Sequence, residues 1–273
     1  MKKYTLLFLA FFALENVNAQ DWQWQNPLPQ GSSLMSVIFV DSLTGFTAGD
    51  GGAILKTTDG GATWSFPDSG SSAPIGVEGI YFTDTLTGFV TGNNYWNNNW
   101  YSFILKTLDG GMTWDTVLKR INGDLYSIYF TSHNKGHAVG IGGTIINTTD
   151  GGTTWSDIIE GPVDNLSSVY FTNINMGYAS GDNGRFLKTI NGGKNWNVLS
   201  TGTTNGLRSI CFSDSNTGYA VGDNGIILRT GNAGLTWTAI QTGDSNYLNA
   251  VFFADQNTDY AAGWGILGRV KYS

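Results

Sequence analysis

The sequence predicts an all-β protein, a six-bladed β-propeller of four-stranded antiparallel blades closed by its N-terminal strand. One observation behind this is a box with the pattern Thr-x-Asp-Gly-Gly-x-Thr-Trp at 57–64, which returns at 107–114 and 148–155. Two further copies, at 189–196 and 230–237, have Asn at the Asp position. The other is a phenylalanine that recurs at spacings of 43, 48, 41, 41 and 41 residues, namely Phe39, Phe82, Phe130, Phe171, Phe212 and Phe253. A repeat of about 40 to 45 residues is typical of a propeller blade.

Each repeat contains four strand signals in the same order. The first is the alternating run around the phenylalanine, as in 36–41. The second starts with Gly and an aromatic residue, as in 177–181, and the third reads Ile-Leu-Lys-Thr, as in 54–57. The glycines of the box end the third strand, and a fourth begins at its Thr-Trp. Since no segment shows helical periodicity, we expect only strands and turns.

The last repeat ends at Ser273 before any box, so its fourth strand is missing at the C-terminal end. Trp24 lies 15 residues before Phe39, close to the 16 that separate a box tryptophan from the next phenylalanine. We therefore expect Trp22–Gln25 to form the outer strand of the sixth blade. This strand would pair a sheet edge that otherwise stays open.

The N-terminal residues 1–19 predict a secretory signal peptide. Lys2 and Lys3 precede an apolar run at 6–14 and the small-residue site 17–19. Nine apolar residues are too few to span a membrane, which takes about 20. We expect cleavage after Ala19, a single β-propeller domain over 20–273, no membrane span after cleavage, and a secreted or cell-envelope location.

Composition narrows the choice of partners. The formal net charge is −7, with only 14 Lys and Arg, which argues against a nucleic-acid or anionic-membrane partner. The one cysteine, Cys211, cannot form an internal disulfide, so stability must come from the core. His137 occupies a column of aromatic core residues and His133 a turn, so no histidine pair or cysteine cluster is left for a metal. We predict a monomer without cofactor or metal.

We interpret the box as scaffold. Its glycines allow the positive φ angles of a tight turn, its Asp can accept hydrogen bonds from amides in that turn, and its Trp anchors the outer strand. A residue that returns in every repeat at one spacing serves the blade. The structural pairs are Asp59 and Trp64, Asp109 and Trp114, Asp150 and Trp155, Asn191 and Trp196, and Asn232 and Trp237. The same reasoning assigns Asp50, Asp182 and Asp223 to repeated loops and Asp41, Asp84, Asp214 and Asp255 to turn caps.

Two places depart from the repeat and are candidate binding sites. The second repeat carries a seven-residue insertion within 92–102, where Tyr95, Trp96, Trp100 and Tyr101 stand among asparagines. Such aromatic residues can stack on sugar rings or form a protein hot spot. The alternative is a long hairpin that packs over its own blade.

The second departure is the position four residues before each phenylalanine, at the start of the innermost strand. It varies while its neighbours do not, and it is filled by Met35, Glu78, Tyr126, Ser167, Arg208 and Asn249. We expect this column to ring the mouth of the central channel, with Glu78 and Arg208 on opposite blades. Glu78, Tyr126, Arg208 and Asn249 are the candidate partner-binding residues, although channel mouths are polar in any case.

The boxes and the run Gly-Tyr-Ala-Val-Gly-Asp-Asn-Gly-Ile-Ile-Leu at 218–228 carry a family resemblance. The box is similar to the Asp-box, or bacterial neuraminidase repeat, and the chain resembles the photosystem II assembly and stability factor-like propellers over about 22–273. The resemblance implies a non-enzymatic factor that holds a partner protein. Plant and cyanobacterial members resemble seven-bladed propellers, whereas this chain has six repeats. Asp-boxes also occur in sialidases, xyloglucan-cleaving hydrolases and sortilin-type receptors, so the box alone selects no function.

We therefore expect a secreted binding or assembly module that presents one propeller face to a protein or glycan at the cell envelope or outside the cell. The alternative is a carbohydrate-active glycoside hydrolase. Against it, the arginine motif of sialidases is absent near the start of the domain, because the first arginine is Arg120. No two carboxylates stand at a recognisable catalytic spacing. We predict no enzymatic activity.

Overall fold

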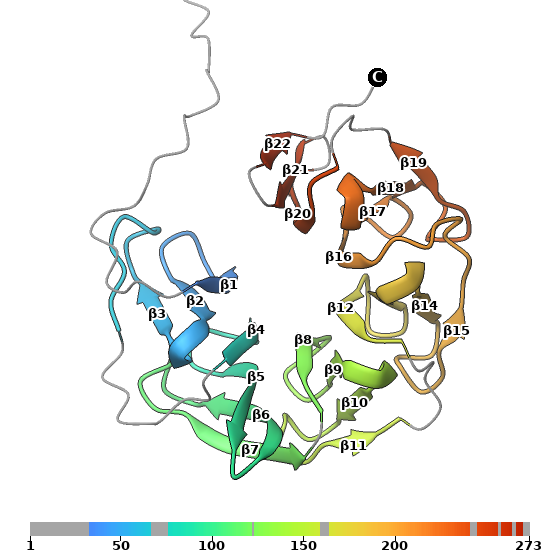
Figure 1. Ribbon diagram of the computed structural model, residues 1–273. Helices are drawn as coiled ribbons and strands as arrows, with labels where there is room; N and C mark the ends of the chain where they lie inside the picture. The colour runs from blue at the N-terminus through green and yellow to red at the C-terminus, as the bar shows by residue number, and fades with distance from the viewer. Residues whose placement is uncertain are drawn as a thin grey trace, which may run out of the picture.

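The computed structural model describes residues 33–66, 76–121, 123–158, 164–240, 245–255, 258–263 and 266–269. The protein is an all-β β-propeller whose antiparallel sheets follow one another around a central axis, each with its first strand innermost (Figure 1). The first sheet contains β1 (Leu34–Phe39), β2 (Gly45–Gly49) and β3 (Ile54–Thr57); the second contains β4 (Gly76–Phe82), β5 (Gly88–Trp96), β6 (Asn99–Thr107) and β7 (Asp115–Ile121). The third contains β8 (Leu125–Phe130), β9 (Gly136–Gly140), β10 (Ile145–Thr148) and β11 (Ser156–Asp157).

The fourth sheet contains β12 (Leu166–Phe171), β13 (Gly177–Gly181), β14 (Phe186–Thr189) and β15 (Asn197–Val198). The fifth contains β16 (Leu207–Phe212), β17 (Gly218–Gly222), β18 (Ile227–Thr230) and β19 (Thr238–Ile240), and the last contains β20 (Leu248–Asp255), β21 (Thr258–Gly263) and β22 (Ile266–Arg269). Short 3-10 turns join the second and third strands of four sheets: η1 (Asp50–Gly52), η2 (Ile141–Gly143), η3 (Asp182–Gly184) and η4 (Asp223–Gly225).

The prediction of six four-stranded blades in a closed ring is not met by the described residues. Four sheets have four strands, whereas the first and the last have three, and these two sheets do not meet (Figure 1). In the first sheet the fourth strand is reduced to a single bridge between Lys56 and Ser65. The predicted closing strand, Trp22–Gln25, and the predicted signal peptide, residues 1–19, lie outside the described part of the chain.

The hydrophobic core lies between successive sheets. An aromatic residue on the second strand of one sheet stacks on the repeated phenylalanine of the next: Phe46 on Phe82 with ring centroids 3.7 Å apart, Phe89 on Phe130 at 4.1 Å, and Tyr178 on Phe212 at 4.3 Å. Each box tryptophan then meets the phenylalanine of its own sheet edge-on, as Trp114 meets Phe82 at 6.0 Å. The two residues that give the sequence its period are therefore the two that fill each junction.

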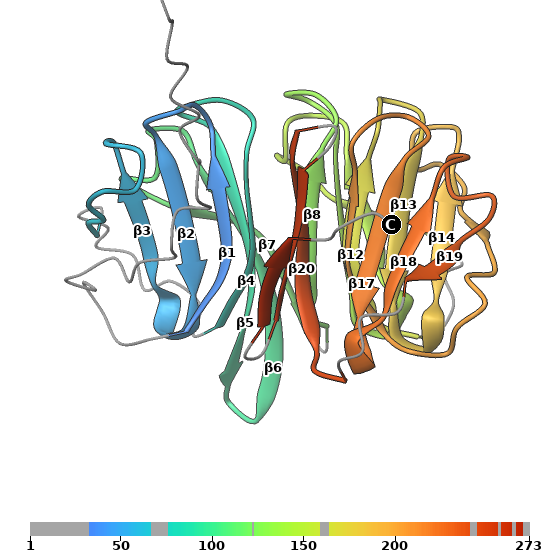
Figure 2. The same ribbon diagram turned by 90° about the horizontal axis from the view of Figure 1, so that it is seen from above.

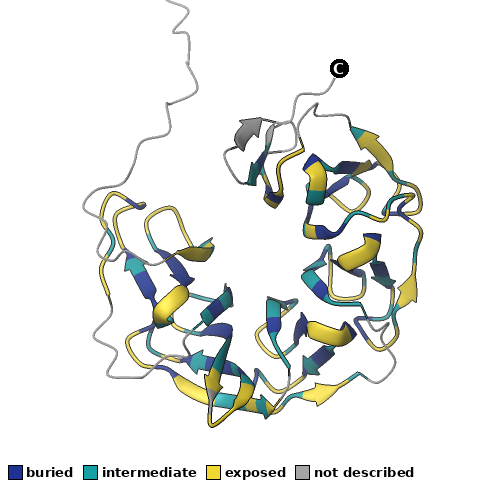
Figure 3. Ribbon diagram, in the orientation of Figure 1, coloured by how far each residue is buried: buried dark blue, intermediate teal, exposed yellow. Residues whose placement is uncertain are grey.

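The first sheet shows what happens where no sheet precedes it. Strand β1 is largely exposed, whereas β4 is largely buried (Figure 3). Val37 on β1 is 62% exposed and its counterpart on β4, Ile80, is 6% exposed. Leu34 is likewise exposed, whereas its counterpart Val77 is fully buried. The sequence pattern is the same in both strands. The difference arises because β4 packs against the first sheet and β1 has no such neighbour among the described residues.

The box turns have the geometry that their sequence predicts. Gly110 and Gly111 have φ angles of 70° and 85°, in the left-handed region that favours glycine. The Asp109 carboxylate accepts hydrogen bonds from the Thr113 amide at 2.9 Å and from the Thr113 hydroxyl at 2.6 Å. These bonds lower the pKa of Asp109 to about 2, the Thr113 hydroxyl contributing most. Gly110 also donates to the Leu86 carbonyl, so the box turn is tied to the turn between the first two strands.

One junction carries a histidine where its neighbours carry Phe or Tyr. His137 on β9 is fully buried and stacks on Phe171, with ring centroids 4.5 Å apart. Neither ring nitrogen has a hydrogen-bond partner among the described residues. Burial, and secondarily the nearby Lys135 charge, lower its pKa to about 3. His137 is thus a neutral core residue, as its column in the repeat predicts.

Candidate functional site

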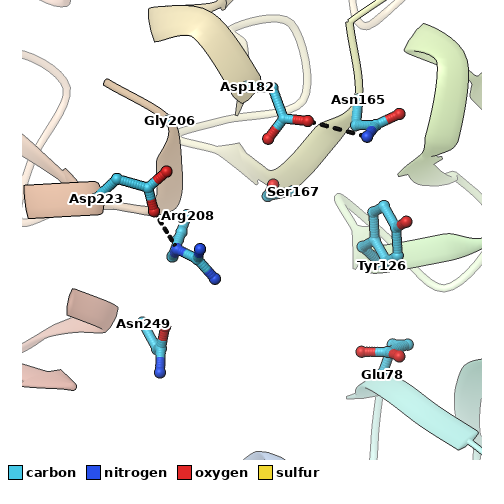
Figure 4. Close-up of a pocket in the computed structure, with 9 residues that line it drawn as sticks. All are labelled: Glu78, Tyr126, Asn165, Ser167, Asp182, Gly206, Arg208, Asp223 and Asn249. Carbon is cyan, nitrogen blue, oxygen red and sulfur yellow. Dashed lines mark hydrogen bonds and ion pairs between the residues drawn. The ribbon is translucent and has the colours of Figure 1, made fainter. Parts of the chain in front are cut away.

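A pocket of about 350 Å³ lies at the mouth of the central channel (Figure 4). Its lining consists of Glu78, Tyr126, Asn165, Ser167, Asp182, Gly206, Arg208, Asp223 and Asn249. The structure thus brings together five of the six residues of the variable column: Ser167 and the four candidate partner-binding residues Glu78, Tyr126, Arg208 and Asn249. Glu78 and Arg208 lie on opposite sides of the opening, as predicted (Figure 4). Met35, from the same column, is exposed and does not line the pocket.

A β-bulge explains why this column points into the channel. In each innermost strand the pairing register skips one residue, as between Val77 and Gly79 in β4 and between Leu207 and Ser209 in β16. The skipped residues are Glu78 and Arg208, and the other four first strands skip the equivalent position. A bulged residue is left out of the ladder and its side chain is re-aimed. Its identity is therefore not constrained by strand pairing.

Hydrogen bonds and stacking hold one side of the pocket in place. Arg208 Nε donates to Asp223 Oδ1 at 2.5 Å, and its guanidinium lies 4.9 Å from the centre of the Tyr247 ring. Asn165 Nδ2 donates to Asp182 Oδ2 at 2.9 Å. A second arginine of the same face, Arg185, is paired with Asp164 just outside the pocket.

The opposite side of the pocket is acidic. Burial raises the pKa of Glu78, and the charges of Asp124 and Asp50 raise it further. Burial also raises the pKa of Asp124. The Tyr126 hydroxyl has a raised pKa from burial and from Asp124, Glu78 and Asp182, in that order. The negative charges of the neighbouring carboxylates therefore raise the pKa of both Glu78 and Tyr126.

The insertion predicted as a binding loop is a long hairpin. Strands β5 and β6 stay paired out to Trp96 and Asn99, and Asn97 and Asn98 form the turn with φ angles of 50° and 60°. The hairpin projects beyond the rest of the ring on the side where the 3-10 turns lie (Figure 2). The box turns are at the opposite ends of the strands. The pocket and the hairpin therefore belong to one face.

The hairpin separates the four aromatic residues that the sequence grouped together. Tyr95 and Trp100 pair across the strands with ring centroids 5.1 Å apart and are each 51% exposed. Tyr101 lies on the other side of the hairpin, half-buried beneath the Lys119 ammonium at 4.4 Å from the ring centre. The side chain of Trp96 is outside what the structure describes. Tyr101 packs on its own blade, as the alternative interpretation expects, whereas the exposed pair Tyr95 and Trp100 stays a predicted binding site.

The exposed aromatic pair connects to the acidic side of the pocket. Asn93, two residues before Tyr95 on the same side of β5, lies close enough to Glu78 for its side chain to lower the pKa of that carboxyl group. On β6, the side chains of Ile104 and Trp100 point to the same side of the strand, because the two positions are four residues apart. Ile104 belongs to the core cluster that also contains Leu125 of the third sheet. Tyr95 and Trp100 therefore lie on the side of the hairpin that is turned toward the third sheet, where Asp124 precedes β8 and Tyr126 is its second residue.

Sequence reasoning missed Asp182, Asp223 and Asn165 as pocket residues. The two aspartates were assigned to repeated loops because Asp50 stands at the same place. The signal that could have found them is position: they follow the second strand, at the channel-mouth end of their sheets, and Ile141 shows that the loop does not require Asp there. Among the described residues no group of three or more His, Cys, Asp and Glu could hold a metal ion. The described helical segments include none with the length and apolar character needed to cross a membrane.

Comparison with known proteins adds a family to this geometry. The family model described as photosynthesis system II assembly factor YCF48 matches residues 158–246. The resemblance inferred from the boxes is confirmed. The matched segment contains the fourth and fifth repeats, and with them Ser167 and Arg208 of the pocket. No curated protein matches the chain.

Solved structures share the fold at low sequence identity. The structure described as YCF48 bound to D1 peptide is 17% identical with a TM-score of 0.51, over 90% of this chain and 94% of that one. YCF48 from Cyanidioschyzon merolae is 17% identical with a TM-score of 0.57, over 88% and 96%. An ancestral GH74 enzyme is 19% identical with a TM-score of 0.69, over 92% of this chain but 36% of that one. At these identities the comparisons show the β-propeller fold.

Proposed function

We propose that this protein is a non-enzymatic binding or assembly module that holds a protein partner on the face formed by the channel-mouth pocket and the β5–β6 hairpin. The observation that carries the proposal is that the two departures from the repeat, the pocket and the hairpin, lie on this one face. The family match to an assembly factor and the likeness to a propeller described as bound to a peptide support it. The N-terminal pattern of residues 1–19 supports export to the cell envelope or beyond.

The test removes the exposed aromatic pair. Tyr95→Ala with Trp100→Ala should leave the melting temperature unchanged, because both side chains are half-exposed and lie on the hairpin outside the core clusters. The mature protein is used as bait on an envelope extract, and any protein recovered is then purified and titrated directly. We expect the double variant to lose at least about tenfold in affinity, as for a hot-spot pair. A matched control is Leu108→Ala, which removes an exposed apolar side chain from a box turn on the opposite face. Equal losses from both variants, or none from either, would contradict the proposal.

A glycoside hydrolase remains the second candidate because of one observation. Glu78 and Asp124 both have raised pKa values, and a general acid requires a carboxyl group that stays protonated near neutral pH. The fold likeness to GH74 enzymes supports this candidate as well. Release of reducing ends from xyloglucan by the wild type, lost in Glu78→Gln, would establish it and overturn the non-enzymatic proposal.

We also propose that six repeats close into a ring, with Trp22–Gln25 as the fourth strand of the last sheet. The support is the aromatic pair found at the junctions: Tyr219 meets Phe253 at 5.2 Å, and Tyr260 occupies the next position of the same column. Phe39, exposed on β1, has the position that would receive it. A Phe39→Cys, Tyr260→Cys variant in a Cys211→Ser background should cross-link within one chain if the ring closes. Cross-linking between two chains would indicate exchange of sheets instead.

A further inference from the structure

The channel-mouth pocket has an excess of negative charge. Its lining contains three carboxylates, Glu78, Asp182 and Asp223, and one basic residue, Arg208. Arg208 and Asp223 compensate each other through their ion pair. Asp182 accepts its hydrogen bond from the neutral amide of Asn165. In the ion pairs formed by the described residues, no basic side chain is paired with Glu78 or Asp182.

The environment of Glu78 adds to this excess. Asp124 and Asp50 are close enough to raise its pKa, and one carboxylate oxygen of Asp124 is buried without a hydrogen-bond partner among the described residues. The Tyr126 ring lies between the carboxylates of Glu78 and Asp182 at the pocket wall (Figure 4). Like charges held this close raise the free energy of the empty site. A cation placed among them would lower it, and the face of Tyr126 would add a cation–π contact.

The exposed aromatic pair extends the same site outward. Tyr95 lies two residues beyond Asn93 on the same side of β5, and Asn93 is close enough to Glu78 to lower its pKa. The hairpin from Asn93 to Ser102 contains no charged residue. A ligand that crosses from the hairpin into the pocket therefore meets aromatic rings first and carboxylates second. Ammonium and guanidinium groups interact favourably with both.

We infer that this site binds a lysine or arginine side chain carried by an extended segment of a protein partner. The inference rests on the proposed function, because it names the chemistry of the partner that this face would hold. An acidic segment fits less well, since Arg208 is already paired with Asp223 and stacked on Tyr247. A neutral glycan would cover the carboxylates of Glu78 and Asp182 without compensating their charge, which is unfavourable.

The experiment uses the mature full-length protein and three hexapeptides with free ends blocked: Gly-Ser-Lys-Lys-Gly-Ser, and its Gln-Gln and Glu-Glu counterparts. Binding is followed by NMR through the indole N–H signal of Trp100, assigned from Trp100→Phe. We expect the lysine peptide to bind at least about tenfold more tightly than the glutamine peptide and to weaken as salt is raised. The glutamate peptide should produce no shift of this signal.

Two substitutions place the effect in the pocket. Glu78→Gln should weaken the lysine peptide about fivefold or more, which is the scale of one partly buried charge contact. Asp115→Asn is the matched control, because it makes the same change in net charge at an exposed position beside a box turn, on the opposite face. Its affinity for the lysine peptide should equal that of the wild type.

The outcomes separate this inference from the proposed function. If the glutamate peptide binds as tightly as the lysine peptide, if no peptide binds, or if Glu78→Gln and Asp115→Asn weaken binding equally, the inference is wrong. The proposed function would still stand if the wild type recovers a partner that depends on Tyr95 and Trp100. If that partner is not found but the lysine peptide binds through Glu78, the site is a receptor for basic groups and the assembly role is wrong.

Discussion

Replacing His137 by phenylalanine should stabilise the protein and remove part of its sensitivity to acid. The imidazole is fully buried, and both its nitrogens lack hydrogen-bond partners among the described residues. A buried unpaired polar group costs about 1 to 3 kcal/mol. Phenylalanine fits the site because Phe89 fills the same place in the preceding sheet. An added Cβ on Gly152 would lie 2.4 Å from the Phe89 ring, and one on Gly193 would lie 2.4 Å from the His137 ring. The ring of Phe89 and the ring of His137 therefore lie equally close to the box glycine of the next sheet, at the junction that each fills.

The pH dependence follows from the lowered pKa. An unfolded histidine titrates near 6.5, whereas burial keeps the pKa of His137 at about 3 in the folded protein. A group whose pKa is depressed on folding contributes its stability above the unfolded value and loses it as the pH falls. At pH 5 the unfolded chain gains about 1.5 pKa units of protonation free energy that the folded chain lacks, or about 2 kcal/mol. At pH 7.5 the same difference is close to zero.

Urea unfolding of the two proteins at pH 7.5 and at pH 5.0 measures this difference. Between pH 7.5 and pH 5.0 the free energy of unfolding should fall by about 2 kcal/mol more for the wild type than for His137→Phe, since the two proteins share all other titratable groups, including the exposed His133. The reverse substitution, Phe89→His, should introduce a similar loss at the equivalent junction. If wild type and His137→Phe lose the same stability to within about 0.5 kcal/mol, the buried neutral imidazole is not the cause and the reasoning is wrong.

Three further predictions concern the scaffold. Asp109→Asn should reduce the fall in melting temperature between pH 4.5 and pH 2.5, because the pKa of Asp109 is lowered to about 2 and the stabilisation that its carboxylate provides is lost as the pH falls through that value. The variant should fold, since Asn232 makes the equivalent hydrogen bonds with Thr236 in the fifth sheet. A fall in melting temperature equal to that of the wild type would contradict the assignment. Tyr129→Phe should lower the free energy of unfolding in urea by about 1 kcal/mol, because the Tyr129 hydroxyl donates a hydrogen bond to the Phe171 carbonyl of the next sheet at 3.0 Å. An unchanged free energy of unfolding would mean that water replaces this hydrogen bond. Deleting Gln20–Gln25 should lower the melting temperature by several degrees if these residues complete the last sheet, and no shift would refute the closure.

The repeat made most of the fold predictable, and its columns explain why. A residue such as Phe82 or Trp114 meets the same neighbours in every sheet, so its spacing in the sequence reports a spatial contact. His137 and Cys211 could be assigned to the core because their columns are otherwise apolar, and both are buried. The ends of the chain were less predictable. Val37 stands at the same place in its strand as Ile80, yet it is exposed because no described sheet packs against the outer side of β1.

The candidate site was predictable only where the repeat varies. Glu78 and Arg208 could be found because the bulge removes them from the strand ladder, so their column differs from blade to blade. Asp182 and Asp223 were missed for the opposite reason, since both serve a repeated turn and also line the pocket. A column that looks structural in every repeat can still become part of a site when the axis of the propeller brings several copies together. Periodicity therefore identifies what a blade needs, but it does not show which of those residues face the channel.

The same distinction decides how the hairpin should be understood. Its inner half, up to Gly92 and Phe103, continues the register of the sheet, and Phe103 packs against the junction with the first sheet. Beyond that point Tyr95 and Trp100 are half-exposed, their rings contact each other, and neither belongs to a core cluster of the described residues. The exposed area of these two aromatic side chains is in contact with water, so a partner that covers it would gain the free energy of burying apolar surface. The hairpin reaches past the 3-10 turns on the face that carries the pocket (Figure 2), so the proposed partner would approach Glu78 and Asp182 from the same side.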